Sequence, residues 1–346
     1  MTIRISWMRA ILTLLALGVF VMGVAWSGVI SLAANVPHFA PVEWFIHWTY
    51  ENSVRTQARK AAEPAIDATG LVSAAGHFAT SCASCHGAPG ERPSPVMQAA
   101  AVKAPDLAVN AKNWSNRELF WIIKHGVKYT PMPAWPTQDR DDEVRRMVAF
   151  VRVLPGMSPA RYRALAYDSA NATQPQCAGC HGADGLGRGQ RDIPVIAGQN
   201  QAAIIAALHK YARGVRPSAV MQTVAARTDP TTWRGIAADY AALPGRLVHD
   251  PIRIDTARDR AAAEIVARGR PSSGLPACSS CHARGKREYV PILRGQKPAY
   301  LAGRLRRWQE GEAIEANRSA ATMPTIARRI PPDMIDPLAR YYAIQR

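Results

Sequence analysis

The sequence is poor in the residues that build sheets. Aromatic residues make up 7% of its 346 positions, and runs of β-branched residues are scarce. Because both kinds of residue are enriched in strands, their scarcity argues against a sheet-rich fold, whereas the abundance of Ala and Arg favours helices. Acidic residues are also in the minority, since 26 Asp and Glu face 43 Lys and Arg, for a net charge of +17. We therefore expect an all-α, strongly basic protein.

Cysteine is scarce as well, and no cysteine lies outside three copies of the pattern Cys-x-x-Cys-His. The copies comprise Cys82, Cys85 and His86; Cys177, Cys180 and His181; and Cys278, Cys281 and His282. A zinc site usually joins two Cys-x-x-Cys pairs, so three pairs do not divide into such sites, and zinc gives no reason for the histidines. A thioredoxin-type dithiol would need a βαβ pattern, which is not found around any copy.

The same pattern is the signature of covalent c-type haem attachment. The two thiols join the two vinyl groups of one haem, and the histidine that follows supplies the proximal ligand of the iron. Three copies that use every cysteine predict three covalently bound c-type haems, with the six cysteines as attachment points and the three histidines as iron ligands.

Each predicted haem needs a second axial ligand if it is to be closed to small molecules. Met132, Met221 and Met323 follow their histidines by 46, 40 and 41 residues. A thioether ligand suits Fe(II) and raises the reduction potential, so these three methionines are the predicted distal ligands. His125 is an alternative to Met132, and Met334 is an alternative to Met323.

The proximal imidazoles should each have a hydrogen-bond acceptor for the ring nitrogen that does not face the iron. Pro105, Pro194 and Pro291 lie between haem motif and methionine in their repeats, and a proline carbonyl would serve. Arg216 and Arg318 are candidate partners of the haem propionates, because a guanidinium matches the fork of a carboxylate.

The N-terminal segment is long and apolar. Residues Ala10 to Ala34 contain no charge over 25 positions, which is about 37 Å of helix and enough to cross a bilayer. Arg4 and Arg9 precede it, so the positive-inside rule places the N-terminus in the cytoplasm and the rest in the periplasm. We expect a single-pass anchor in a bacterial inner membrane, in contact with lipid. The alternative is a signal peptide cleaved after Ser31–Ala33, although the run exceeds the usual length.

Two further features concern the surroundings of the haem region. The segment from His38 to Val54 is crowded with aromatic residues and predicts a helix at the membrane interface, or else one packed on the first haem domain. The basic charge would suit nucleic acid, but export argues against that partner. Six propionates would still leave a charge of about +11.

Three repeats follow the anchor. The predicted organisation is an anchor (1–34), an aromatic segment and linker (35–69), and three domains (70–155, 156–245 and 246–346). The second and third repeats share "IPVIAGQ" with "VPILRGQ" and the pattern M-x-T-[VI]-A-x-R around Met221 and Met323. These two modules are therefore predicted to be duplicates.

The repeats resemble class I cytochromes c. The likeness rests on Phe78 four residues before Cys82, the Cys-x-x-Cys-His motif, a proline loop, a methionine and a terminal helix. The segment "ELFWIIKHGVKYTPMPAW" resembles single-haem domains of respiratory complexes, and the second and third repeats resemble periplasmic di-haem cytochromes. A departure is Ala283, which stands where the other copies have Gly87 and Gly182.

This resemblance implies three class I cytochrome c domains and electron transfer by haem irons that cycle between Fe(II) and Fe(III). The whole arrangement is similar to membrane-bound cytochromes that accompany bacterial haem–copper oxidases, so the expected function is to pass electrons towards a terminal oxidase. The alternative is the cytochrome subunit of a periplasmic dehydrogenase. An enzyme with one open haem is disfavoured by the three methionines, so we expect an electron carrier.

Overall fold

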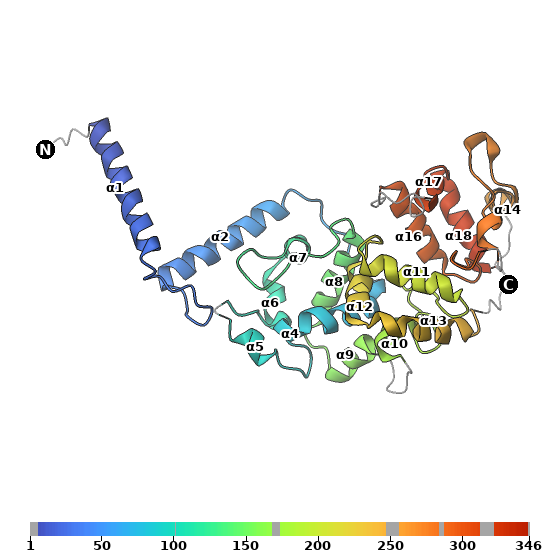
Figure 1. Ribbon diagram of the computed structural model, residues 1–346, viewed down its shortest axis with the longest axis horizontal. Helices are drawn as coiled ribbons and strands as arrows, with labels where there is room; N and C mark the ends of the chain where they lie inside the picture. The colour runs from blue at the N-terminus through green and yellow to red at the C-terminus, as the bar shows by residue number, and fades with distance from the viewer. Residues whose placement is uncertain are drawn as a thin grey trace.

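The computed structural model describes residues 6–100, 102–167, 174–246, 256–283, 287–311 and 322–344. Within these ranges the regular elements are all helical, and the strand pairing consists of two isolated bridges. The all-α prediction is confirmed. Figure 1 shows α1 at one end of an elongated molecule and the C-terminal helices at the other, with the remaining helices packed between them.

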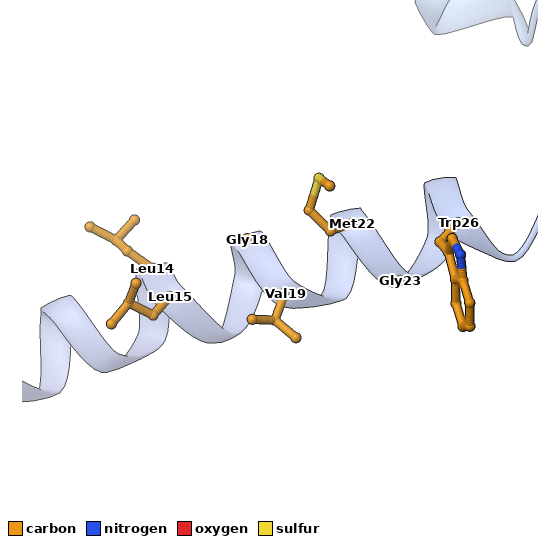
Figure 2. Close-up of a pocket in the computed structure, with 7 residues that line it drawn as sticks. All are labelled: Leu14, Leu15, Gly18, Val19, Met22, Gly23 and Trp26. Carbon is orange, nitrogen blue, oxygen red and sulfur yellow. The ribbon is translucent and has the colours of Figure 1, made fainter.

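Helix α1 (Trp7–Trp26) is the one helix in the described part of the chain that is long and apolar enough to cross a membrane. None of its residues is buried, and Figure 2 shows apolar side chains such as Leu14, Val19 and Met22 extending from an isolated helix. The helix ends eight residues before the apolar run does, because Gly28 follows in the left-handed region with a φ of 70°. By length and composition α1 fits a membrane anchor and a signal sequence alike.

Helix α2 (Ala40–Ala58) has two different halves. In the first half Trp44, Phe45 and Trp48 are exposed, and the two tryptophan rings stack 6.2 Å apart. In the second half Val54 and Ala58 are buried, and the ring of Tyr50 lies edge-on to Trp114 at 5.6 Å. The C-terminal half therefore packs on the first haem region, while the N-terminal half presents aromatic rings to the surroundings.

The first haem region runs from η1 to α8. Its elements are η1 (Ala68–Gly70), α3 (Leu71–His77), the π-helical segment η2 (Phe78–Cys82), α4 (Ala83–His86), α5 (Pro95–Gln98), α6 (Leu107–Asn110), η3 (Ala111–Asn113), α7 (Asn116–His125) and α8 (Asp141–Val153). A capping box of Ser115 and Glu118 starts α7. Helix α8 begins with three acidic residues, which suits the positive end of its dipole, and it packs on α3 and α7.

The second and third regions repeat one order of elements. The second has α9 (Pro159–Ala166), α10 (Pro175–His181), α11 (Gln201–Ala212), α12 (Ala219–Arg227), η4 (Pro230–Thr232) and α13 (Trp233–Ala242). The third has α14 (Ala257–Arg268), η5 (Pro271–Ser273), α15 (Ser279–His282), α16 (Pro298–Gln309), α17 (Thr322–Ala327), η6 (Pro332–Met334) and α18 (Ile335–Ile344). Equivalent backbone bonds run from Gly198 N to Tyr240 O and from Gly295 N to Tyr342 O, at 3.0 and 2.9 Å.

One helix departs from this repeat. Helix α14 packs on α18 of its own region, whereas α9 packs on α3 of the first region. The ring of Tyr162 on α9 is fully buried, 6.4 Å from the rings of both Phe78 and Phe150. A single hydrophobic cluster therefore crosses the repeat boundary predicted at residue 155.

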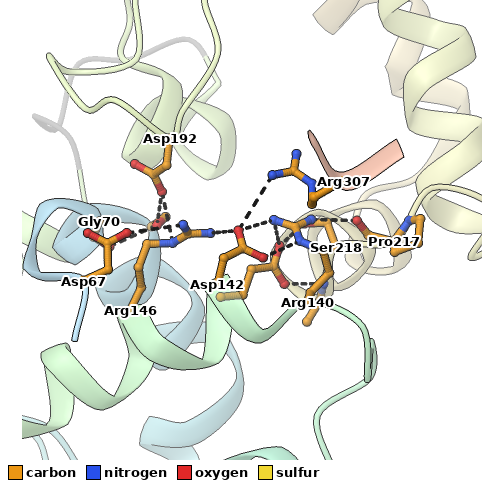
Figure 3. Close-up of polar contacts among 12 residues, drawn as sticks. Asp67, Gly70, Arg140, Asp142, Arg146, Asp192, Pro217, Ser218 and Arg307 are labelled. Atoms are coloured by element: carbon orange, nitrogen blue, oxygen red, sulfur yellow. Dashed lines mark hydrogen bonds and ion pairs between the residues drawn. The ribbon is translucent and has the colours of Figure 1, made fainter. Parts of the chain in front are cut away.

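A buried ionic network joins the first region to the other two (Figure 3). On α8, Asp142 accepts from Arg140 at 2.8 Å and from Arg146 at 2.7 Å, and Arg307 of the third region lies 4.0 Å away. Arg146 also pairs with Asp192 of the second region at 3.4 Å. Burial alone would raise the pKa of Asp142, but the Arg140 hydrogen bond and the neighbouring guanidinium charges hold that pKa far below its ordinary value.

Glu143 is the second carboxylate of this network and the more deeply buried, with a side chain that is 3% exposed. It pairs with Arg140 at 3.0 Å, accepts from the Ser218 hydroxyl at 2.6 Å and accepts from Ala219 N at 2.8 Å. Since Ser218 is the N-cap of α12, a side chain of the first region completes the cap of a helix in the second.

Candidate haem-binding sites

The three Cys-x-x-Cys-His motifs occupy the same kind of place. Each ends at the histidine that closes a short helix, namely α4, α10 or α15, and the first cysteine is the N-cap residue of α4 and of α15 but lies within α10. The next residue is Gly87 with a φ of 70°, Gly182 with a φ of 78°, and Ala283 with a φ of −69°. After the first two motifs the backbone turns through the left-handed region that glycine favours, whereas after the third motif it continues in an extended conformation. Ala283, which stands where the other two motifs have glycine, therefore coincides with a different backbone conformation after the helix.

All three histidines make the same hydrogen bond. The Nδ1 atoms of His86, His181 and His282 lie 2.8, 3.2 and 2.9 Å from the carbonyl oxygens of Pro105, Pro194 and Pro291. The predicted acceptors are therefore confirmed. The loops between histidine and proline differ in length, with separations of 19, 13 and 9 residues, yet they converge on one contact.

This contact fixes the chemical form of each ring. A carbonyl oxygen can only accept, so Nδ1 carries the hydrogen and Nε2 keeps its lone pair. Burial lowers the pKa of all three imidazoles, to about 4 for His181, and the proline carbonyls offset it only in part. At neutral pH each ring is therefore uncharged, with a free Nε2, as a proximal iron ligand must be.

The six thiols are unlike those of a redox-active dithiol. All are free and half-buried. Burial raises the pKa of Cys82 to about 12 and that of Cys177 and Cys180 to about 11, whereas a reactive Cys-x-x-Cys thiol has a lowered pKa. In the described part of the chain, no three His, Cys, Asp or Glu side chains gather into a metal site. The raised pKa values of Cys82, Cys177 and Cys180 therefore weigh against a redox-active dithiol.

The predicted distal methionines lie in defined and half-buried places. Met132 is in the loop between α7 and α8, where its N–H points to the Thr130 hydroxyl at 3.2 Å and its carbonyl accepts from Val127 N at 3.1 Å. Met221 donates its N–H to the N-cap Ser218 at 3.2 Å. Met323 stands at the second position of α17. Their role as iron ligands stays a prediction.

The two alternative ligands have other contacts. His125 is exposed at the end of α7, with its ring 5.2 Å from that of Trp121. Met334 is 5% exposed and belongs to the hydrophobic cluster of the third region. Met323, by contrast, is half-buried and outside that cluster's fully buried set. These positions favour Met132 and Met323 over their alternatives.

The arginines proposed for the propionates have a mixed outcome. Arg216 donates to the Tyr300 hydroxyl at 2.6 Å and lies 4.7 Å from the ring of Tyr211, so it connects the second region to the third. Arg318 lies outside the described residues.

Sequence reasoning missed several residues that join the regions. Gly76 on α3 has no side chain, and a Cβ there would come within 2.9 Å of Cys180 Sγ, so glycine allows the second motif to approach the first region. Gln199 and Gln296 bond across the second and third regions. Both glutamines belong to the "GQ" that follows the proline in both repeats, but one sequence alone does not show which residue a glutamine is hydrogen-bonded to.

Three haem-attachment motifs on an all-α scaffold, each with a histidine held by a proline carbonyl, define a multihaem c-type cytochrome. Residues 71–151 match the family model described as subunit III of cbb3-type cytochrome c oxidase. The chain thus carries class I cytochrome c domains, whose chemistry is electron transfer by haem.

Two curated relatives are both named thiosulfate dehydrogenase electron acceptor. The protein of Stutzerimonas stutzeri (strain A1501) is 29% identical over 177 residues, which cover 50% of this chain and 81% of the relative. The protein of Thiomonas intermedia (strain K12) is 29% identical over 202 residues, which cover 57% of this chain and 89% of the relative.

Similar solved structures include reduced cytochrome c4 from Pseudomonas stutzeri, with 25% identity, a TM-score of 0.43 and coverage of 49% of this chain and 93% of that one. Another is the thiosulfate dehydrogenase of Marichromatium purpuratum, with 29% identity, a TM-score of 0.41 and coverage of 49% and 36%.

Proposed function

We propose that the protein is a membrane-anchored, periplasmic tri-haem cytochrome c. Its haems are attached through the six cysteines, with the histidine of each motif as proximal ligand and Met132, Met221 and Met323 as distal ligands. The observation that carries the proposal is the histidine–proline hydrogen bond, which recurs three times across loops of 19, 13 and 9 residues. The three domains would follow the repeats, at residues 70–155, 156–245 and 246–346.

Haem supplies one-electron chemistry when it is bound, and the protein sets its conditions. The proline carbonyls hold the imidazoles in the tautomer that leaves Nε2 free. Methionine at the opposite position would close the site to small ligands and favour the reduced state. A site closed in this way passes electrons without binding a substrate, which suits a carrier.

We propose a periplasmic dehydrogenase of the thiosulfate-oxidising kind as the electron donor. Support comes from the names of the two curated relatives, which are 29% identical and are matched over 81% and 89% of their lengths. The sequence alone favoured an oxidase as partner, with a dehydrogenase as the alternative, and these relatives favour the alternative.

The donor can be tested directly. The oxidised protein is mixed with a thiosulfate dehydrogenase and thiosulfate, and reduction is followed by the α-band of c-type haem. We expect rapid reduction that requires both enzyme and thiosulfate. Mixtures that lack either one are the controls, and no acceleration by the enzyme over thiosulfate alone would refute this donor.

A second partner is favoured by the first region, because residues 71–151 match a subunit of a cbb3-type oxidase. The protein would then pass electrons on to a haem–copper oxidase. The measurement is oxygen uptake by a purified cbb3-type oxidase supplied with the reduced protein. The two partners are compatible, since one gives electrons and the other takes them.

The membrane location rests on α1, a 20-residue helix that carries no charge after Arg9 and is long and apolar enough to cross a membrane. We propose that α1 is retained and spans the membrane, with its N-terminus in the cytoplasm. Intact mass measurement of protein extracted from membranes distinguishes an anchor from a cleaved signal. A mature chain that begins after Ala33 would show cleavage.

A further inference from the structure

Two glutamines, Gln199 of the second region and Gln296 of the third, each form hydrogen bonds to the backbone of the other region. Gln296 accepts from Val195 N at 2.8 Å through Oε1 and donates to Val195 O at 2.9 Å through Nε2. Gln199 does the same to Ile292, accepting from its N–H at 3.0 Å and donating to its carbonyl at 2.7 Å. Each side-chain amide therefore forms two hydrogen bonds, one to the N–H and one to the carbonyl of a single residue in the other region.

The bonded residues directly follow the prolines that hold the proximal histidines. The Val195 N–H belongs to the same peptide group as the Pro194 carbonyl, which accepts from His181 at 3.2 Å. The Ile292 N–H belongs to the same peptide group as the Pro291 carbonyl, which accepts from His282 at 2.9 Å. Each glutamine oxygen is thus two hydrogen bonds and one peptide group away from an imidazole of the other region.

Such a chain of hydrogen bonds is cooperative. When an amide N–H donates, electron density moves to its carbonyl oxygen, which becomes a better acceptor. A stronger bond at Nδ1 gives the imidazole more anionic character and makes Nε2 a stronger donor to a metal. A stronger donor favours Fe(III) over Fe(II), so it lowers the reduction potential.

We propose that Gln296 lowers the reduction potential of the haem at His181, and that Gln199 lowers that of the haem at His282. Each region would thereby set the potential of the other through the peptide group behind its proximal histidine. The inference rests on the proposed haem ligation. Gln296 is suited to this role because it is 5% exposed, so water does not compete for its bonds.

The first region provides an internal comparison. His86 bonds to Pro105 at 2.8 Å, but the residue after that proline is Asp106, the N-cap of α6. Among the residues that the structure describes, no glutamine is hydrogen-bonded to the peptide group between Pro105 and Asp106. The potential of the haem at His86 should therefore be indifferent to both glutamines.

The test compares three variants of the full-length holoprotein. Gln296→Leu and Gln199→Leu each remove one amide from the chain of bonds while retaining a side chain of similar bulk. Asn200→Leu is the matched control, because Asn200 Nδ2 donates across the same interface to Val290 O at 2.9 Å. That carbonyl belongs to the peptide group before Pro291, which has no N–H and so no donor that could extend the chain of hydrogen bonds.

Two measurements report on each variant. A redox titration resolves three one-electron steps, and NMR of the reduced, ¹⁵N-histidine-labelled protein gives the Nδ1–H shift of each proximal histidine, assigned by contacts within its own region. Polarisation changes a neighbouring bond by about 10–30%. Applied to the roughly 4–6 kcal/mol of an amide hydrogen bond in an apolar medium, this sets an upper limit of about tenfold on the change in the Fe(III)/Fe(II) equilibrium, or about 60 mV at 59 mV per decade.

The expected result is crosswise. Gln296→Leu should raise the potential at His181 and shift that Nδ1–H signal upfield, and Gln199→Leu should do the same at His282. Asn200→Leu should move neither. The proposal is overturned if each variant shifts the haem of its own region, if Asn200→Leu shifts His282 as much as Gln199→Leu does, or if nothing moves. A haem count of three in every variant keeps these outcomes apart from failure of the haem assignment itself.

Discussion

Replacing Glu143 by alanine should loosen the junction between the first and second regions. The carboxylate serves two buried groups at once, because it neutralises Arg140 and completes the N-cap of α12 through Ser218 and Ala219. The variant leaves a guanidinium with a side chain that is 8% exposed and an Ala219 N–H without its acceptor. Asp142 keeps its own bond to Arg140, so part of the compensation survives.

The size of the effect follows from this burial. Removing one partner of a buried ion pair costs about 3–5 kcal/mol. Since Asp142 still faces Arg140, we expect the lower end, about 3 kcal/mol of unfolding free energy. With a urea dependence of about 2 kcal/mol per molar, the midpoint should fall by about 1.5 M.

Urea unfolding followed by far-UV circular dichroism measures this loss, and urea is preferred because guanidinium salts would screen the ion pairs. Asp336→Ala is the control, since Asp336 pairs with Arg306 at 2.6 Å but both side chains are about half exposed (56% and 46%). An exposed pair contributes at most about 1 kcal/mol. Equal losses of unfolding free energy in the two variants would show that burial of the Glu143–Arg140 pair does not increase its contribution to stability.

Three other predictions concern the haems and the charges, and a fourth the partner. Denatured protein should retain three covalent haems per chain in a pyridine haemochrome assay, and one or two would contradict the assignment of the motifs. Met221→Ala should allow carbon monoxide to bind one haem of the reduced protein and lower its potential, whereas Met97→Ala on α5 should do neither. The pKa of Asp142 is depressed in the folded protein, so its contribution to stability is complete above the ordinary pKa of about 3.9 and is lost as the pH falls below it. Wild-type urea midpoints should therefore decline on acidification below about pH 4, and Asp142→Asn should flatten that part of the decline. The rate of electron transfer from an acidic partner should fall steeply as ionic strength rises, because the charge of about +11 that remains after six haem propionates would steer the encounter; a rate indifferent to salt would show that this charge recruits no partner.

Much of the site could be predicted because its residues act locally. The Cys-x-x-Cys-His motif is contiguous, and Pro105, Pro194 and Pro291 were identified as acceptors because each lies between the haem motif and the methionine of its repeat. The loop lengths did not have to be known, since the histidine–proline bond forms at separations from 9 to 19 residues.

What could not be predicted depends on packing between regions. Glu143 lies in "DDEVRRM", which has the charge density of a solvated helix face, yet two of its three partners, Ser218 and Ala219, are more than 70 residues away along the chain. The end of α1 at Trp26 was also missed. Hydropathy continues to Ala34, but Gly28 adopts a conformation that stops the helix.

The position of Tyr162 shows that the sequence repeats and the packed units of this protein do not share a boundary. The sequence predicts that the second repeat begins after residue 155, but by packing its helix α9 closes the aromatic cluster of Phe78 and Phe150. A gene fusion or deletion that cut the chain between the first two repeats would leave that cluster open to water. We therefore expect the first two repeats to be inherited together, whereas in the described part of the third repeat α14 packs on α18 of the same repeat, as expected of a unit that evolution could exchange.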